Sequence, residues 1–120
     1  WTITGPGQLD SGKSQRPRPK LLYALPDGLR FDSMAVDASG YVNVGVLSLG
    51  SMTENAGGIC EISPEGEARI IQTGDPMTTN ICFGGKDHQT AFITCSDSGT
   101  LRSFPWPREG IRLPFFDNAI

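Results

Sequence analysis

The sequence has no long hydrophobic run and little charge. None of its 120 residues lies in an apolar stretch of about 18, which excludes a membrane-spanning helix. Ten Lys and Arg stand against 13 Asp and Glu, giving a formal net charge of −3, so the basic surface typical of nucleic-acid binding is missing. We therefore expect neither a membrane nor a nucleic acid as a partner. At 38% hydrophobic and 19% charged residues, the composition also excludes a disordered chain.

Cysteines are few and are not spaced in pairs. The three of them, Cys60, Cys82 and Cys95, form no CxxC motif, and each lies in a short apolar run. This setting is typical of buried free thiols, which pack as small hydrophobic groups. Disulfide and zinc sites instead use paired spacings. The cysteine pattern favours a cytoplasmic location.

Glycine and proline, in contrast, are abundant. The chain has 15 Gly and 9 Pro, one position in five, whereas the two together make up about 12% of an average protein. Their even spread excludes a coiled coil, and no window carries a clean helical period. The chain opens at Trp1 and shows no signal peptide. We expect either that an upstream part was removed or that this is a piece of a longer protein.

Short strand-like runs follow a Gly-, Pro- and Ser-rich connection at residues 5–20. Turn signals close these runs at residues 26–28, 38–40 and 64–66. The spacing of about 8–12 residues predicts an all-β fold, which could be a sandwich, a barrel or a propeller. The predicted strands are residues 20–25, 33–37, 41–49, 57–63 and 67–73.

The second half of the chain repeats the first. Residues 80–85, 90–95, 99–104 and 111–115 correspond in turn to the runs beginning at positions 33, 41, 57 and 67. A unit of about 40–50 residues with four strands has the size of one propeller blade and counts against a single closed barrel. A blade buries its faces against two neighbours, and a propeller closes only with about 4–8 blades. We therefore expect that 120 residues are not the whole folding unit.

Several segments, in this order, carry a family resemblance: residues 1–9, 26–37 (PDGLRFDSMAVD), 57–59 with 63–66, 79–85 (TNICFGG) and 106–110 (WPREG). They resemble the gluconolactonase, regucalcin (senescence marker protein) and luciferin-regenerating-enzyme family. The resemblance implies a six-bladed β-propeller, of which this chain would be the C-terminal part, about two blades and a leading outer strand. Residues 1–25 would end one blade, residues 32–73 would form the next, and residues 79–116 would form the last.

The same resemblance implies a metal-dependent hydrolase that opens a sugar-type lactone. Two usual metal ligands of the family, a Glu and an Asn, would lie upstream, and the third matches Asp32, just before a predicted strand. A carboxylate there suits calcium best, with zinc, magnesium or manganese as alternatives. Asp32 is thus the candidate metal ligand and also the candidate catalytic base. With ligands missing, we expect the isolated chain to be inactive. Without the resemblance, the spacing alone favours an ordinary turn residue at Asp32.

Thr79 and Asn80 occupy the matching position one blade later. They are candidate substrate-binding residues for a small lactone, although a strand-capping role is the alternative. We expect Asp37 to be a turn residue and Trp106 to be a packing anchor. In the second strand of the first predicted blade, Asn43 and Gly45 depart from the family's small apolar residues.

A longer loop at residues 47–55 would shape a different substrate mouth. The alternative function is a non-catalytic calcium-binding or scaffold propeller, since a structural metal would require Asp32 as well.

Overall fold

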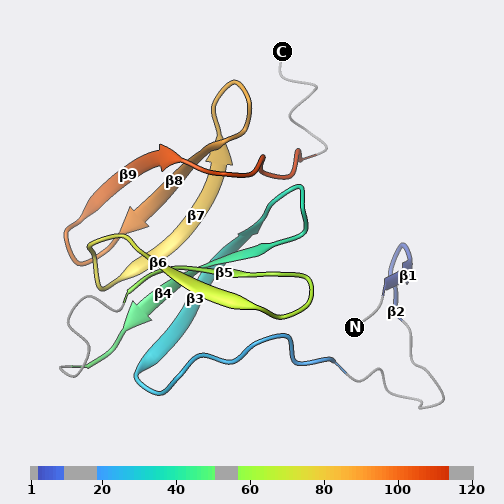
Figure 1. Ribbon diagram of the computed structural model, residues 1–120, viewed down its shortest axis with the longest axis horizontal. Helices are drawn as coiled ribbons and strands as arrows, with labels where there is room; N and C mark the ends of the chain where they lie inside the picture. The colour runs from blue at the N-terminus through green and yellow to red at the C-terminus, as the bar shows by residue number, and fades with distance from the viewer. Residues whose placement is uncertain (1–2, 10–18, 51–56, 114–120) are drawn as a thin grey trace.

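The structure is a computed structural model that describes residues 3–9, 19–50 and 57–113 (Figure 1). Every regular element within these ranges is a β-strand, so the predicted all-β class is confirmed. The strands form antiparallel sheets of two, four and three members. None of the described segments contains a helix long and apolar enough to cross a membrane.

The four-stranded sheet is a meander in chain order. Its strands are β3 (Leu29–Val36), β4 (Val42–Ser48), β5 (Gly58–Ile62) and β6 (Ala68–Gln72). Tight turns join β3 to β4 and β5 to β6, with Gly40 and Gly66 at φ values of 82° and 100° that other residues rarely adopt. The glycine-containing turns that the sequence repeats thus join neighbouring strands of the sheet.

Two predicted boundaries in this half of the chain were wrong. The strand expected over residues 33–37 begins at Leu29, because buried Leu29 pairs with Ser48 and extends the ladder. Asp32 therefore lies within β3 and not before it. Residues 20–25 form no strand, and Leu22, Tyr23 and Leu25 instead pack on the apolar face of the sheet.

The three-stranded sheet comprises β7 (Thr78–Gly84), β8 (Thr90–Cys95) and β9 (Thr100–Pro105). A fourth strand was predicted over residues 111–115, but residues 111–113 are not in a strand, and residues 114–115 lie outside the described ranges. After β9 the chain returns to the first sheet, where Gly110 bridges Asp37 and the amide of Ile111 donates to the carbonyl of Val36 at 3.2 Å. These bonds draw the segment away from β9.

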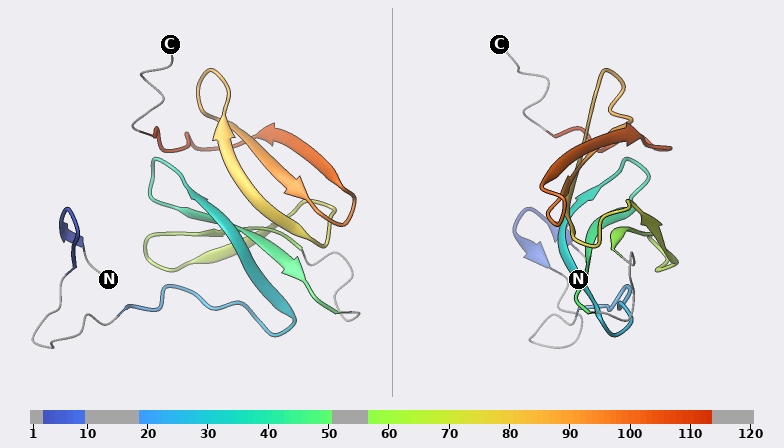
Figure 2. Two further views of the ribbon diagram at one scale, coloured as in Figure 1. Left: turned by 180° about the vertical axis from the view of Figure 1, so that it is seen from behind. Right: turned by 90° about the vertical axis from the view of Figure 1, so that its left-hand side faces the viewer.

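The hairpin of β1 (Ile3–Gly5) and β2 (Gln8–Leu9) forms the two-stranded sheet. It lies to one side of the two larger sheets (Figures 1 and 2). Residues 1–9 resemble the outer strand of a preceding blade, and in the structure β1 pairs with β2.

The main core lies between the two larger sheets, both of which contribute side chains to it. It comprises Ile59, Ile81, Ala91, Ile93, Cys95 and Trp106. Trp106 is 3% exposed and contacts Phe83 and Phe104, with ring centroids 5.8 and 5.7 Å away. Its predicted packing role is confirmed. A second cluster on the other face of the four-stranded sheet comprises Leu29, Val44, Val46, Cys60 and Ile62.

Two of the three cysteines are buried as predicted, and Cys82 is not. Cys60 and Cys95 belong to the two cores, and burial, with the nearby charge of Glu61, raises the pKa of Cys60 to about 11. Cys82 is exposed because side chains alternate along a strand, and its neighbours Ile81 and Phe83 take the core face. An apolar run therefore did not determine which face its cysteine occupies.

The link between the two larger sheets is held by Asp75. Its Oδ1 accepts a hydrogen bond from the amide of Met77 at 2.8 Å. Its Oδ2 accepts two from Ser98, one from the amide at 2.9 Å and one from the hydroxyl at 2.7 Å. Burial by itself would raise the pKa of Asp75, but these bonds outweigh it and hold the pKa below its ordinary value.

Candidate functional site

Asp32 lies in a β-bulge near the start of β3. Phe31 pairs with Val46 and Met34 pairs with Val44, which leaves Asp32 and Ser33 together opposite the single residue Gly45. Two residues facing one is the mark of a bulge, a feature that redirects side chains and is frequent beside active sites. The Asp32 side chain is exposed, and the Ser33 hydroxyl lies 3.5 Å from its Oδ1. The carboxylate is thus open to a ligand.

A second bulge occupies the corresponding place in β7. Thr78 pairs with Cys95 and Asn80 pairs with Thr94, so Thr79 is the inserted residue. The Thr79 side chain is half-buried, and its Oγ1 lies 2.8 Å from Thr94 Oγ1. Asn80 is exposed, and its Oδ1 accepts a hydrogen bond from the amide of Ile81 at 2.8 Å. The sequence correspondence between Asp32 and the pair Thr79–Asn80 therefore coincides with a repeated bulge.

Gly45 brings the two bulges together. A Cβ at this position would lie 2.6 Å from the carbonyl oxygen of Thr78 and 2.8 Å from the carbonyl carbon and oxygen of Thr79. Gly45 also stands opposite Asp32 and Ser33 in the ladder. The β3 bulge is therefore its neighbour within the sheet, and the β7 bulge packs where its side chain would be. The β3 and β7 strands are accordingly in contact (Figure 1). We define Asp32, Ser33, Gly45, Thr79 and Asn80 as the bulge site.

Sequence reasoning did not find the role of Gly45. The residue was noted as a departure from the family pattern, but its contact with β7 is a tertiary feature. A signal was present, since a glycine inside a strand often marks the close approach of another backbone. Its partner could not be read from the sequence.

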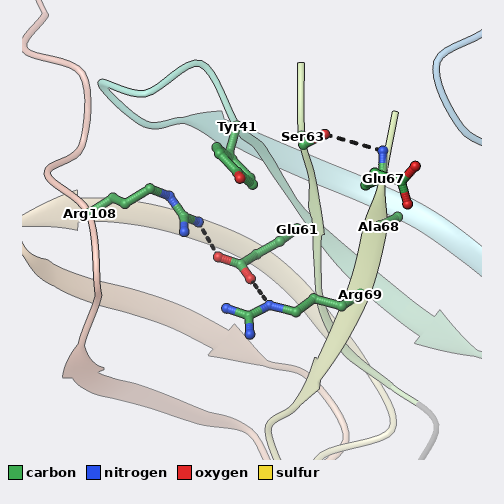
Figure 3. Close-up of a pocket in the computed structure, with 7 residues that line it drawn as sticks. All are labelled: Tyr41, Glu61, Ser63, Glu67, Ala68, Arg69 and Arg108. Carbon is green, nitrogen blue, oxygen red and sulfur yellow. Dashed lines mark hydrogen bonds and ion pairs between the residues drawn. The ribbon is translucent and has the colours of Figure 1, made fainter. Parts of the chain in front are cut away.

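A pocket lies at the opposite end of the four-stranded sheet (Figure 3). It has a volume of about 290 Å³ and lies between the segment joining β3 to β4 and the turn joining β5 to β6. Its lining residues are Tyr41, Glu61, Ser63, Glu67, Ala68, Arg69 and Arg108. Six of the seven have polar or charged side chains, and none of these six is a candidate site residue in the sequence analysis.

Ion pairs dominate this pocket. Glu61, only 2% exposed, receives hydrogen bonds from both Arg69 and Arg108 (Figure 3). Arg108 also donates from Nε to Asp37 Oδ2 at 2.6 Å, and its guanidinium carbon lies 4.0 Å from the ring centroid of Tyr41. Partial burial by itself would lower the pKa of Arg108, but hydrogen bonds and charge attraction to Asp37 and Glu61 raise it above its ordinary value. The two arginines and the two carboxylates neutralise one another within the fold, so we interpret the pocket as a structural junction.

Asp37 belongs to the same junction. Its Oδ1 accepts from the amides of Ser39 and Tyr41 at 3.0 and 3.1 Å, which matches its expected turn role. Its bond to Arg108 was not foreseen, because the two residues are 71 positions apart and no local spacing relates them.

The metal-binding capacity of the bulge site is partial. No group of three or more His, Cys, Asp or Glu residues able to hold a metal occurs among the described residues. The site does offer the exposed Asp32 carboxylate and the oxygen of Asn80, donors of the kind that calcium and magnesium prefer. Asp32 therefore fits the role of one oxygen ligand in a set that other residues would complete.

Comparison with known proteins agrees with the fold and the segment order. Residues 8–97 match the model of the SMP-30/gluconolactonase/LRE-like region, which is three quarters of the chain. The chain belongs to the SMP-30/gluconolactonase/LRE-like family. An X-ray structure of a protein assigned by family as a gluconolactonase superposes with a TM-score of 0.61 at 20% sequence identity. The match covers 88% of this chain and 32% of that structure, so the chain spans about a third of its length.

Proposed function

We propose that this chain is part of a metal-dependent hydrolase that opens a sugar-type lactone, with the bulge site as its contribution to the active site. The observation that carries the proposal is the repeated bulge: two inner strands present Asp32 and Thr79–Asn80 at equivalent places, held together at Gly45. Membership of the family supports the lactonase class.

We further propose that the two larger sheets are consecutive blades of a six-bladed propeller. The four-stranded meander has the size of one propeller blade, and the meander of β7, β8 and β9 supplies three strands of a second. The two sheets pack against each other through the main core. In this arrangement residues 32–73 and 79–116 are the two last blades, and residues 1–25 end the blade before them. The coverage of 32% of the related structure supports a partial propeller.

Three residues of the bulge site, Asp32, Thr79 and Asn80, have chemical roles in this proposal. A bound divalent ion, calcium foremost, would supply Lewis acidity at the lactone carbonyl and a more acidic water. The Asp32 carboxylate would help to hold such an ion and would accept a proton from the attacking water. Water adds to the carbonyl carbon, the ring C–O bond breaks, and the proton taken up by Asp32 passes to the leaving ring oxygen, so that the product is a hydroxy acid. Thr79 and Asn80 orient the lactone through its hydroxyl groups.

The test is turnover of glucono-δ-lactone by the longest natural polypeptide that contains residues 1–120, which we call the parent polypeptide. Acid release is followed by pH-stat with calcium, with zinc and with a chelator, each corrected for spontaneous hydrolysis. We expect metal-dependent turnover that falls at least about 100-fold in Asp32→Asn, because ligand and base are removed together. Asp27→Asn is the matched control, since Asp27 is exposed in a nearby turn.

Two other outcomes would contradict the proposal. Turnover that survives Asp32→Asn would move the chemistry away from the bulge site. Absence of turnover, with calcium still raising the melting temperature, would instead support the non-catalytic calcium-binding propeller.

A further inference from the structure

Three hydroxyl groups lie in a row. They belong to Thr79 near the start of β7, to Thr94 near the end of β8 and to Ser96 in the turn that follows β8. Thr79 Oγ1 lies 2.8 Å from Thr94 Oγ1 and 3.2 Å from Ser96 Oγ. Thr94 and Ser96 are exposed, and Thr79 is half-buried. Each hydroxyl offers one donor and two acceptor positions. The contacts within the row, together with the bond from the Thr79 hydroxyl to the carbonyl oxygen of Thr94 at 3.4 Å, therefore leave acceptor positions for a ligand. We call these three residues the hydroxyl row.

The hydroxyl row adjoins the bulge that holds Asp32. Thr79 is both the central member of the row and the residue whose backbone packs on Gly45. Gly45 in turn stands opposite Asp32 and Ser33 in the ladder of β3 and β4. Asn80, the register partner of Thr94, adds an exposed amide beside the row. A molecule bound at Asp32 would therefore have neutral hydrogen-bonding groups next to it.

The row carries no charge, and this limits the ligands that it suits. Phosphates and carboxylates are bound most strongly by Arg and Lys through charge-assisted bonds. Hydroxyl and amide groups match the alternating donors and acceptors of an uncharged polyol. Thr94 and Ser96 thus extend the candidate site beyond the residues that sequence reasoning identified.

We infer that the hydroxyl row binds the ring hydroxyls of the lactone and selects polyhydroxylated lactones over lactones without hydroxyl groups. The inference rests on the proposed lactonase function. A site that hydrogen-bonds a substrate hydroxyl discriminates against the analogue that lacks it, because its polar groups then lose their partners.

The test compares glucono-δ-lactone with δ-valerolactone, which has the same ring without hydroxyls. The parent polypeptide with calcium is assayed as wild type and as Thr94→Val, a change that removes the hydroxyl at nearly constant volume. We expect KM for glucono-δ-lactone to rise roughly 3- to 10-fold, the worth of one neutral hydrogen bond, with kcat unchanged. The value of kcat/KM for δ-valerolactone stays the same.

Matched controls separate binding from folding. Thr90→Val changes the same residue type on the same face of β8, four positions from Thr94, and leaves both lactones unaffected. Ser96→Ala is a second test variant in an exposed position, with exposed Ser103→Ala on β9 as its control. The Ser96 change is expected to act on glucono-δ-lactone alone, even if Thr94→Val should fail to fold.

The outcomes distinguish the inference from the function on which it rests. In one outcome the wild type turns over lactone, but Ser96→Ala and folded Thr94→Val keep the wild-type ratio of kcat/KM for the two lactones. This result overturns the subsite and leaves the lactonase proposal intact. An equal loss on both lactones also overturns it, because a structural effect has no substrate preference. A wild type that opens neither lactone overturns both.

Discussion

Gly45 shows how one residue sets the distance between two sheets. The backbone of Thr78 and Thr79 occupies the space that a side chain at Gly45 would take, and its nearest atom lies 2.6 Å from where a Cβ would be. Backbone atoms of a paired strand cannot turn aside as a flexible side chain does. The spacing of the bulge site therefore depends on this glycine.

Gly45→Ala should destabilise the parent polypeptide by about 1–3 kcal/mol, because the added methyl overpacks the contact between β4 and β7. Thermal or urea unfolding measures the change. Gly50→Ala is the control: a Cβ at Gly50 meets no atom within 4 Å, and the change is expected to be neutral or slightly stabilising. Equal stability of the two variants would contradict the close approach.

At the scale of elements, the segment after β9 fastens the three-stranded sheet to the four-stranded one. Trp106 fills the core between the sheets, Arg108 pairs with Asp37 and Glu61, and Gly110 bridges Asp37. Residues 106–110, just before the segment that was expected to become a fourth strand, thus link the two sheets. The ion pairs of this segment are important for the stability of the fold because Asp37 and Glu61 are buried.

Arg108→Met should cost about 3 kcal/mol of folding free energy, since it leaves two buried carboxylates without their shared partner. Unfolding of the parent polypeptide in urea measures the loss. Arg112→Met is the control, because the pair of Arg112 with Glu109 is exposed and should be worth less than about 1 kcal/mol. A loss no larger than that of the control would show that the junction adds little.

At the scale of the whole molecule, the described residues contain too few ligands to complete the proposed metal site. Asp32 is a single carboxylate, whereas calcium takes about six to eight oxygen ligands. The match to about a third of a related structure supports the view that other blades complete the ligand set.

Calcium binding should therefore differ between the 120-residue chain and the parent polypeptide. By isothermal titration calorimetry we expect the parent polypeptide to bind calcium and lose binding in Asp32→Asn. The 120-residue chain should show no saturable binding below about 1 mM, the weak end of protein calcium sites. Tight, Asp32-dependent binding by the 120-residue chain would contradict the proposal that the ligands lie in other blades.

Local chemistry accounts for what could be predicted from the sequence. The all-β class, most strand positions and the two-sheet repeat follow from turn residues and apolar runs, which act over a few neighbouring positions. Strand limits were less well predicted where tertiary contacts extend or remove a ladder, as at Leu29 and at residues 111–113. The sequence also predicts Asp32, Thr79 and Asn80 as candidate residues, and all three lie in or beside a bulge.

The sequence by itself thus determined the class of fold, its repeat and its family, because these are carried by local turns and motif order. Only the tertiary structure decided that Gly45 contacts both bulges, that the hydroxyls of Thr94 and Ser96 lie beside Thr79, and that Arg108 links the two larger sheets. These features depend on strand register and on side chains 47 and 71 positions apart, such as Arg108 with Glu61 and with Asp37. Contacts of that range arise only when the sheets pack, so no local pattern encodes them.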